Sequence, residues 1–249
     1  MRALQQLNAM ILRELRSYFL SPMFYIISIA FLLMNGLIFS VIISALQQPD
    51  APHGAVMKSF LGGNEFVLYY IMFVVPIITM RTFSEEISTG TIELLTTVSI
   101  SEKTIVLAKY ISASLIYIIL WIPTLLYPII LSNYTHIDIG PIVTGYIGLL
   151  TLGCMFTAIG VFFSVWTRNQ VIAAITTIMV LFGIFGAGMG EYTMASGTMR
   201  EVAIYINIWS QLENFSQGIL DVNALIYYAS VAMLFLWAAL QRAEAKRWK

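Results

Sequence analysis

The sequence contains little charge, one cysteine and two histidines. Only 10% of its 249 residues are Asp, Glu, Lys or Arg, whereas soluble domains are about 25% charged. The single Cys154 excludes an intramolecular disulfide. His53, His136 and Cys154 lie in three separate segments and provide no metal-ligand cluster. A formal net charge of zero argues against a general nucleic-acid surface. We therefore expect neither a metal site nor a nucleic-acid partner.

The sequence also lacks a phosphate-binding loop. It contains no G-x-x-x-x-G-K-S/T motif and no Gly-Lys pair at all. Such a loop holds nucleotide phosphates through its backbone N–H groups and its lysine. We therefore expect no cofactor in this chain and no ATP hydrolysis by that route, so any energy from ATP would come from a partner.

Apolar residues, in contrast, are abundant. The sequence is 59% hydrophobic and its mean hydropathy is +0.84, whereas soluble domains are about 45–50% apolar. A helix needs about 20 apolar residues to cross a bilayer. We predict an all-α integral membrane protein with a single domain over residues 1–249 and six transmembrane helices, at about 23–46, 63–82, 104–132, 141–166, 169–189 and 223–241.

The second of these spans is the least regular. Its purely apolar part, from Phe66 to Met80, is 15 residues long and contains Pro76. A re-entrant segment is therefore the alternative to a full crossing. We predict a full crossing, because an odd number of spans would destroy the distribution of charge across the membrane.

Residues 1–20 predict an N-terminal amphipathic interfacial helix. Apolar residues recur there at spacings of three and four, and Arg13 and Arg16 fall on the opposite side; the apolar residues are Leu4, Leu7, Ile11, Leu15 and Tyr18. This pattern is typical of a helix in the headgroup plane. Pro22 disfavours helix at Ser21, so the chain can turn into the membrane there.

Basic residues are concentrated on one side of the predicted membrane topology. If all six spans cross, the side with both termini holds eleven of the 13 Lys and Arg residues, namely Arg2, Arg13, Arg16, Arg81, Lys103, Lys109, Arg168, Arg242, Lys246, Arg247 and Lys249. The other side keeps Lys58 and Arg200. The positive-inside bias therefore predicts that both termini are cytoplasmic.

The fifth span and the outer segment that follows it have distinctive compositions. Residues 191–222 mix aromatic and apolar residues with Asn and Ser, which predicts short interfacial or re-entrant helices. Gly186 and Gly190 form a G-x-x-x-G motif, with Gly183 and Ala187 at the same spacing beside them. Small residues at this spacing permit close helix packing. A loosened helix end is the equal alternative for Gly186 and Gly190.

A charged segment, residues 81–109, separates the second span from the third. Charge of this density must lie outside the hydrocarbon, where a soluble partner can reach it. Gly90 predicts a tight turn, after which Thr91 would cap a short helix from Ile92 to Thr97. Ser99 and Glu102 then stand at capping-box spacing before the third span. Such an element can receive a push from a soluble partner, and a solvated loop that only fixes topology is the alternative.

This segment also carries a family resemblance. The run P-I-I-T-M-R-T-F-S-E-E at 76–86, followed by G-T-I-E-L-L-T at 90–96, resembles the signature of type 2 ABC exporter permeases. More narrowly, the chain is similar to the gliding-motility and nitrous-oxide-reductase-maturation permeases, also in the stretches 13–22 and 212–221. The resemblance covers essentially the whole chain. One departure is Leu212, where the resembled pattern has a histidine. A cargo that depends on that histidine would differ here.

The resemblance implies a permease with defined partners. They are a separate ABC ATPase subunit that holds ATP and Mg²⁺, a second permease of the same or a related chain, and the lipid bilayer of the bacterial inner membrane. By position, Gly90 to Thr97 would form a coupling helix. The implied ATPase-coupling residues are Arg81, Glu85, Glu86, Gly90, Thr91, Glu93 and Leu94, and the implied ATPase contacts on the interfacial helix are Arg13, Glu14 and Arg16. Carboxylates beside Arg81 can form charge-assisted bonds that stiffen this hairpin.

Two other function classes are the alternatives. A mechanotransmitting scaffold would use the same inner loop for conformational work and would move no substrate. A secondary transporter would need titratable or anionic residues near the bilayer midplane, and the middle of each predicted span has none. The sequence favours a permease that couples ATP hydrolysis by a separate subunit to export or to conformational work.

Overall fold

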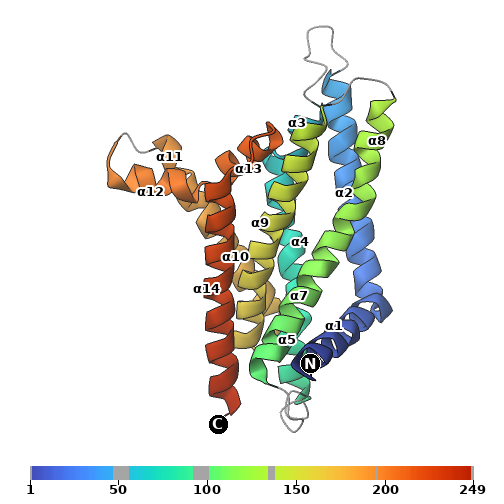
Figure 1. Cartoon of the computed structure of the whole chain (residues 1–249), viewed down its shortest axis with the longest axis vertical. Helices are drawn as coiled ribbons and strands as arrows, with labels where there is room; N and C mark the ends of the chain where they lie inside the picture. Colours follow the sequence, from blue (N-terminus) through green and yellow to red (C-terminus); the bar gives the residue numbers. More distant parts are fainter. Residues whose placement is uncertain (1, 47–55, 92–100, 134–137, 194–195, 248–249) are drawn as a thin grey trace.

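The computed structural model of the chain describes residues 2–46, 56–91, 101–133, 138–193 and 196–247, and the regular secondary structure in these ranges is helical. The long helices run side by side, and both chain ends lie at the same end of the bundle (Figure 1). Six helical segments are long and apolar enough to cross a membrane: Pro22–Ser44, Met57–Thr89, Glu102–Ser132, Ile139–Trp166, Gln170–Thr193 and Val222–Ala245. The predicted all-α fold with six candidate spans is confirmed.

The chain begins with two helices that meet at a sharp bend. Helix α1 (Arg2–Leu20) ends immediately before Ser21, and α2 (Pro22–Leu46) starts after it. Figure 1 shows α1 lying across the end of the bundle, whereas α2 runs along its length. The predicted break at Ser21-Pro22 is therefore confirmed.

The second span continues through its proline. It comprises α3 (Val56–Leu61), α4 (Glu65–Thr79) and α5 (Arg81–Thr89). Pro76 itself has no N–H to donate to the preceding turn. After it the helix continues, because the Met80 N–H donates to the Pro76 carbonyl at 2.8 Å and Met80 keeps helical angles. The helical segment is therefore longer than the predicted 63–82, and its length of 33 residues favours the full crossing.

The third span is interrupted, which the sequence analysis did not predict. It consists of α7 (Glu102–Trp121), the 3₁₀ segment η1 (Ile122–Leu125) and α8 (Leu126–Ser132). Pro123 has no N–H and its ring crowds the preceding turn, so the helix tightens locally. The predicted cap is also corrected, because Ser101 caps α7 by accepting a hydrogen bond from Thr104 N at 3.3 Å.

Helix α9 (Ile139–Trp166) is the central element of the bundle. It contacts α3, α4, α5 and α7, as well as α10 (Gln170–Gly188) and α14 (Val222–Arg247). In the apolar 18-residue stretch of α9, 67% of the residues are buried. The corresponding stretch is 22% buried in the span that contains α2, and 28% buried in each of the spans that contain α10 and α14. The peripheral helices therefore present their apolar side chains mainly outward, as expected for helices that face lipid.

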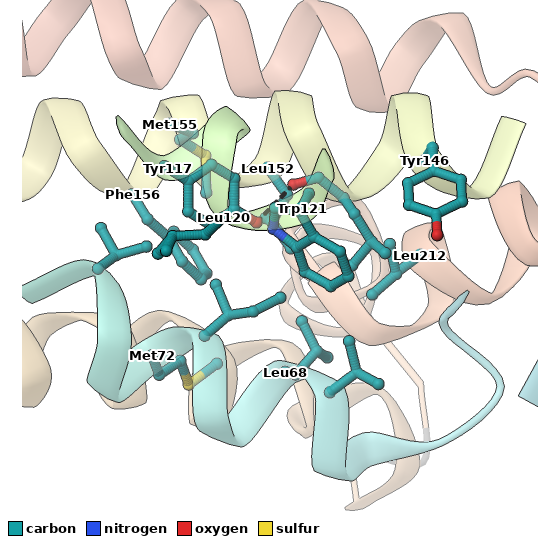
Figure 2. Close-up of a cluster of buried hydrophobic side chains, with 14 of the residues drawn as sticks. Leu68, Met72, Tyr117, Leu120, Trp121, Tyr146, Leu152, Met155, Phe156 and Leu212 are labelled. Atoms are coloured by element: carbon teal, nitrogen blue, oxygen red, sulfur yellow. Dashed lines mark hydrogen bonds between the residues drawn. The ribbon is translucent and has the colours of Figure 1, made fainter. Parts of the chain in front are cut away.

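Aromatic and aliphatic side chains together fill the core between α4, α7 and α9 (Figure 2). Tyr117 is fully buried, and its hydroxyl donates to the Leu149 carbonyl of α9 at 3.0 Å. The ring of Trp121 packs edge-on against Phe31 of α2 at a centroid distance of 5.2 Å. These contacts join the first three spans to the central helix.

Glycines on α9 allow this close packing. A Cβ added to Gly148 would lie 2.7 Å from the ring of Phe215, and one added to Gly153 would overlap the ring of Tyr117. Gly160 is in similarly close contact with Thr79 of α4. Glycines of the fourth span therefore make several of the tight helix contacts among the described residues.

The glycines singled out in the fifth span have a different environment. Gly183, Gly186 and Ala187 are exposed, and a Cβ added to Gly183 or Gly186 would meet nothing within 4 Å. Helix α10 ends at Gly188, and Gly190 begins α11 (Gly190–Thr193), so Gly186 and Gly190 are not on one continuous helix. Any close helix contact at this face would involve another molecule.

The outer segment forms short helices, as predicted. Helices α11 and α12 (Thr198–Ile206) project sideways from the bundle (Figure 1). Helix α13 (Ile208–Ser216) packs on α9 and α3 and buries Leu212 and Phe215 completely. This segment therefore closes the end of the bundle opposite to the chain termini.

The glycine contacts lead to a stability prediction. Gly153→Ala should lower the free energy of unfolding by about 1–3 kcal/mol, because the added methyl group forces the buried Tyr117 ring to shift. Gly183→Ala is the matched control and should be neutral or slightly stabilising, because alanine is the better helix former. Thermal unfolding in mild detergent compares the two, and equal transition midpoints would contradict the assigned packing.

Candidate functional site

The end of the bundle that holds both termini contains a cluster of buried and half-buried charges. Three elements contribute to it: α1, α5 and the first turns of α7. These elements are far apart in the sequence and side by side in Figure 1. We call this set of side chains, Arg13, Glu14, Glu86 and Lys109, the charge cluster.

Helix α1 is amphipathic, but its inner face contacts protein. It packs along α7, with Leu7 and Ile11 against one buried cluster and Leu15 and Tyr18 against another. The predicted amphipathic helix is confirmed, and much of its apolar face packs on other helices of the chain. Leu4 is the exception on the predicted apolar face, because its side chain is 67% exposed.

Lys109 is the centre of the charge cluster. Its side chain is only 1% exposed, and its Nζ lies 3.0 Å from Glu86 Oε2 and 3.4 Å from Glu14 Oε1. The same Nζ donates to the Thr82 carbonyl at 2.6 Å. The ammonium thus donates hydrogen bonds to Glu14 and to the Thr82 carbonyl, whereas its contact with Glu86 is an ion pair. Its charge also lies 5.0 Å from the centroid of the Phe83 ring.

Arg13 closes the charge cluster from the surface side. Its Nη2 lies 2.6 Å from Glu14 Oε1 and 3.1 Å from Glu86 Oε1. Partial burial acts to lower the pKa of Arg13, but the hydrogen bonds and charges of Glu14 and Glu86 raise it overall. Two cations thus balance two carboxylates, which keeps buried charge compensated.

A second set of contacts ties α5 to the bend between α1 and α2. Arg81 Nε lies 3.1 Å from Glu85 Oε2, one helical turn later, and Arg81 Nη1 donates to Ser21 Oγ at 3.2 Å. The Tyr18 hydroxyl donates to the Ile78 carbonyl at 3.0 Å. Burial raises the pKa of Tyr18, so it is a neutral donor at physiological pH.

Ser164 attaches the start of α5 to the central helix. Its Oγ accepts hydrogen bonds from Phe83 N at 2.9 Å and Ser84 N at 3.1 Å, and it donates to the Met80 carbonyl at 3.2 Å. Ser164 is wholly buried on α9. The first turn of a helix has N–H groups without intrahelical partners, and here a side chain from a distant helix satisfies two of them.

The end of α5 has the predicted turn. Gly90 has φ 72°, a left-handed conformation that glycine adopts without strain. The Thr91 hydroxyl lies 2.9 Å from that of Thr89. Glu93, Leu94 and the predicted helix from Ile92 to Thr97 lie outside the described residues.

The predicted site residues therefore divide into groups. Glu86 joins α5 to α1 and α7, whereas Arg81 and Glu85 pair with each other. Arg16 is exposed on α1, and Glu14, predicted as an ATPase contact, is 9% exposed and directed at Lys109.

Sequence reasoning missed the roles of Lys109, Ser164 and Tyr18. Lys109 carried a detectable signal, because it lies seven residues inside a helix that becomes a membrane span and buried lysines are almost always paired. Ser164 and Tyr18 carried no such signal. Within the described ranges, no group of three His, Cys, Asp or Glu residues is arranged to hold a metal ion.

Removing the central cation should destabilise this end of the protein. Lys109→Met leaves Glu14 and Glu86 without their buried partner and should cost about 3–5 kcal/mol of unfolding free energy. Lys103→Met, on the exposed first turn of the same helix, should change it by less than about 0.5 kcal/mol. Thermal unfolding of both variants in mild detergent measures the difference. Similar midpoints would show that the charge cluster does not hold α1, α5 and α7 together.

Comparison with known proteins places this architecture in a family. A search of curated proteins found no match to the chain. A protein-family model described as an ABC-2 family transporter protein matches residues 49–240. These residues include the second to sixth candidate spans and the charged segment 81–109. The chain therefore belongs to the ABC-2 family and is the membrane permease of an ABC-2 type transporter, without a nucleotide-binding domain of its own in these residues.

Proposed function

We propose that the end of the bundle formed by α1, α5 and α7 binds an ABC ATPase subunit. ABC-2 permeases generally pair with ATPase subunits. In this proposal ATP and Mg²⁺ are bound by that subunit, and the permease couples their hydrolysis to export or to conformational work across a bacterial inner membrane.

The charge cluster is the observation that carries the proposal. Glu86 on α5 is joined to α7 through Lys109 and to α1 through Arg13. Ser164 adds a direct connection from α5 to α9. A force applied at Gly90 would therefore act on α5, α7 and α9 together, because the Glu86–Lys109 ion pair and the Ser164 hydrogen bonds resist separation of these helices.

The docking surface in this proposal combines two regions. On α1 it includes Arg16 and the exposed half of Arg13. On the other side it includes Gly90, Thr91 and the following residues through Thr97, among them Glu93 and Leu94. Glu14 supports this surface from inside rather than contacting the ATPase.

A second permease completes the proposed assembly. Nucleotide sandwiches of the resembled class use two ATPases, each on one permease. The exposed small residues of α10, Gly183, Gly186 and Ala187, leave room for a closely packed helix of that second permease. Closure of the ATPases would shift the population between two arrangements of the permease pair.

The narrower relationship also remains a proposal. The stretches 13–22, 76–96 and 212–221 support the gliding-motility and nitrous-oxide-reductase-maturation subgroup. Leu212 departs from that pattern and is fully buried, with its carbonyl 2.7 Å from where a Cβ on Gly62 would lie. The position is thus a packing site in this chain, and a cargo function there is not expected.

The orientation can be tested by labelling. In a Cys154→Ala background, Ser88→Cys on α5 should resist a membrane-impermeant thiol reagent in intact cells, and Arg200→Cys on α12 should react. Both positions are exposed, so both should react after the cells are opened. Labelling of Ser88→Cys in intact cells would place the end formed by α1, α5 and α7 outside the cell and would contradict the proposal.

The docking surface predicts a selective loss of the ATPase. Arg16→Glu should reduce co-purification of the ATPase at least about tenfold, since a reversed charge at a docking contact is repulsive. Arg200→Glu changes an exposed arginine at the opposite end and should leave co-purification unchanged. Quantified affinity purification in mild detergent compares the two. Full retention of the ATPase by Arg16→Glu would contradict the assigned surface.

A further inference from the structure

A pocket opens at the bend between α1 and α2, beside α4, α5 and α7. Its cavity volume is about 70 Å³, and about 580 Å³ when the open mouth is counted, so it is a narrow groove that opens to the surface. The charge cluster borders this pocket only through Glu14. The pocket is therefore a separate feature of the same end of the protein.

The pocket walls change from polar to apolar in one direction. Ser17, Ser21, Arg81 and Glu85 line the part near the bend. Deeper along the spans the lining is apolar and consists of Met23, Phe24, Ile27, Ile77, Ile78, Ile116 and Leu120. Ile116 lies seven residues beyond Lys109 on α7, which is about 10 Å deeper into the bilayer at 1.5 Å per residue.

Arg81 has unused hydrogen-bonding capacity toward the pocket. Its Nη1 donates to Ser21 Oγ, whereas its Nε, although 3.1 Å from Glu85 Oε2, has no hydrogen-bond partner among the described residues. The Arg81 side chain is 34% exposed. A guanidinium in this state is suited to bind phosphate oxygens, and Ser21 and Ser17 add hydroxyl groups beside it.

The charges of the pocket favour a zwitterion over an anion. Glu85 is 47% exposed and lies beside Arg81, so it is available to a cationic group of the ligand. Glu14 also lines the wall, although its own charge is compensated by Lys109 and Arg13. An anionic headgroup would meet both carboxylates, whereas a phosphate with an attached ammonium would meet Arg81 and Glu85 in complementary positions.

We propose that this pocket binds one phospholipid with a zwitterionic aminoethyl phosphate headgroup, from the leaflet at which the chain termini lie. The phosphate contacts Arg81 and Ser21, and the ammonium donates to Glu85. An acyl chain lies along Ile27, Ile77 and Ile116. A lipid in this place would contact both α1 and α5, so its headgroup would brace the bend between α1 and α2.

The test is lipid retention by the full chain, measured by native mass spectrometry after exchange into detergent with a single added lipid. Phosphatidylethanolamine should be retained at a stoichiometry of one, in preference to phosphatidylcholine, whose ammonium has no N–H, and to anionic phosphatidylglycerol. Arg81→Gln should weaken retention about tenfold or more, because charge-assisted bonds to phosphate are lost. Arg16→Gln, a surface arginine that does not line the pocket, is its control. Glu85→Gln should abolish the preference for phosphatidylethanolamine over phosphatidylglycerol.

A second pair of variants keeps the test decisive if Arg81→Gln fails to fold. Ile27→Trp fills the apolar part of the pocket and should prevent retention, whereas Ile26→Trp adds the same group to a neighbouring side chain that is 66% exposed and outside the lining. Equal retention of the three lipids by the unaltered protein would overturn the proposal, because it indicates a nonspecific annulus. So would equal retention by Ile27→Trp and Ile26→Trp.

Discussion

The ion pairs of Lys109 are the interaction on which the charged end of this permease depends. A lysine with 1% exposure can remain charged only if its environment replaces the lost water. Here two carboxylates and a backbone carbonyl do so, and they come from α1 and from α5. The requirement to satisfy one buried ammonium therefore fixes three helices that are distant in the sequence.

This constraint attaches α5, the last helix of the second candidate span, to two other helices. Helix α5 is a direct continuation of α4, since Met80 between them keeps helical angles. Ser164 satisfies N–H groups of its first turn and Lys109 pairs with Glu86 near its end. Helix α5 is therefore attached to its neighbours near both of its ends.

The opposite end and the periphery of the protein are organised by apolar packing instead of ion pairs. The central helix α9 achieves close contact by means of glycines, because removing Cβ atoms allows aromatic rings such as Tyr117 and Phe215 to approach its backbone. The peripheral helices α2, α10 and α14 are mostly exposed within the chain. Their apolar surfaces suit lipid, which agrees with the membership of the chain in the ABC-2 family.

The sequence by itself determined the class of protein, the number of candidate spans, the break at Ser21-Pro22 and the turn at Gly90. These features depend on local composition and on the backbone conformations of proline and glycine, and both can be recognised in the sequence. Only the tertiary structure decided that Glu14 faces inward, that Ser164 caps α5 and that glycines of α9 contact buried rings whereas Gly183 and Gly186 of α10 do not. Such features depend on which face of one helix meets another. The spans of this chain are apolar on nearly all sides, so the pattern of hydropathy does not predict which face of a helix contacts its neighbour.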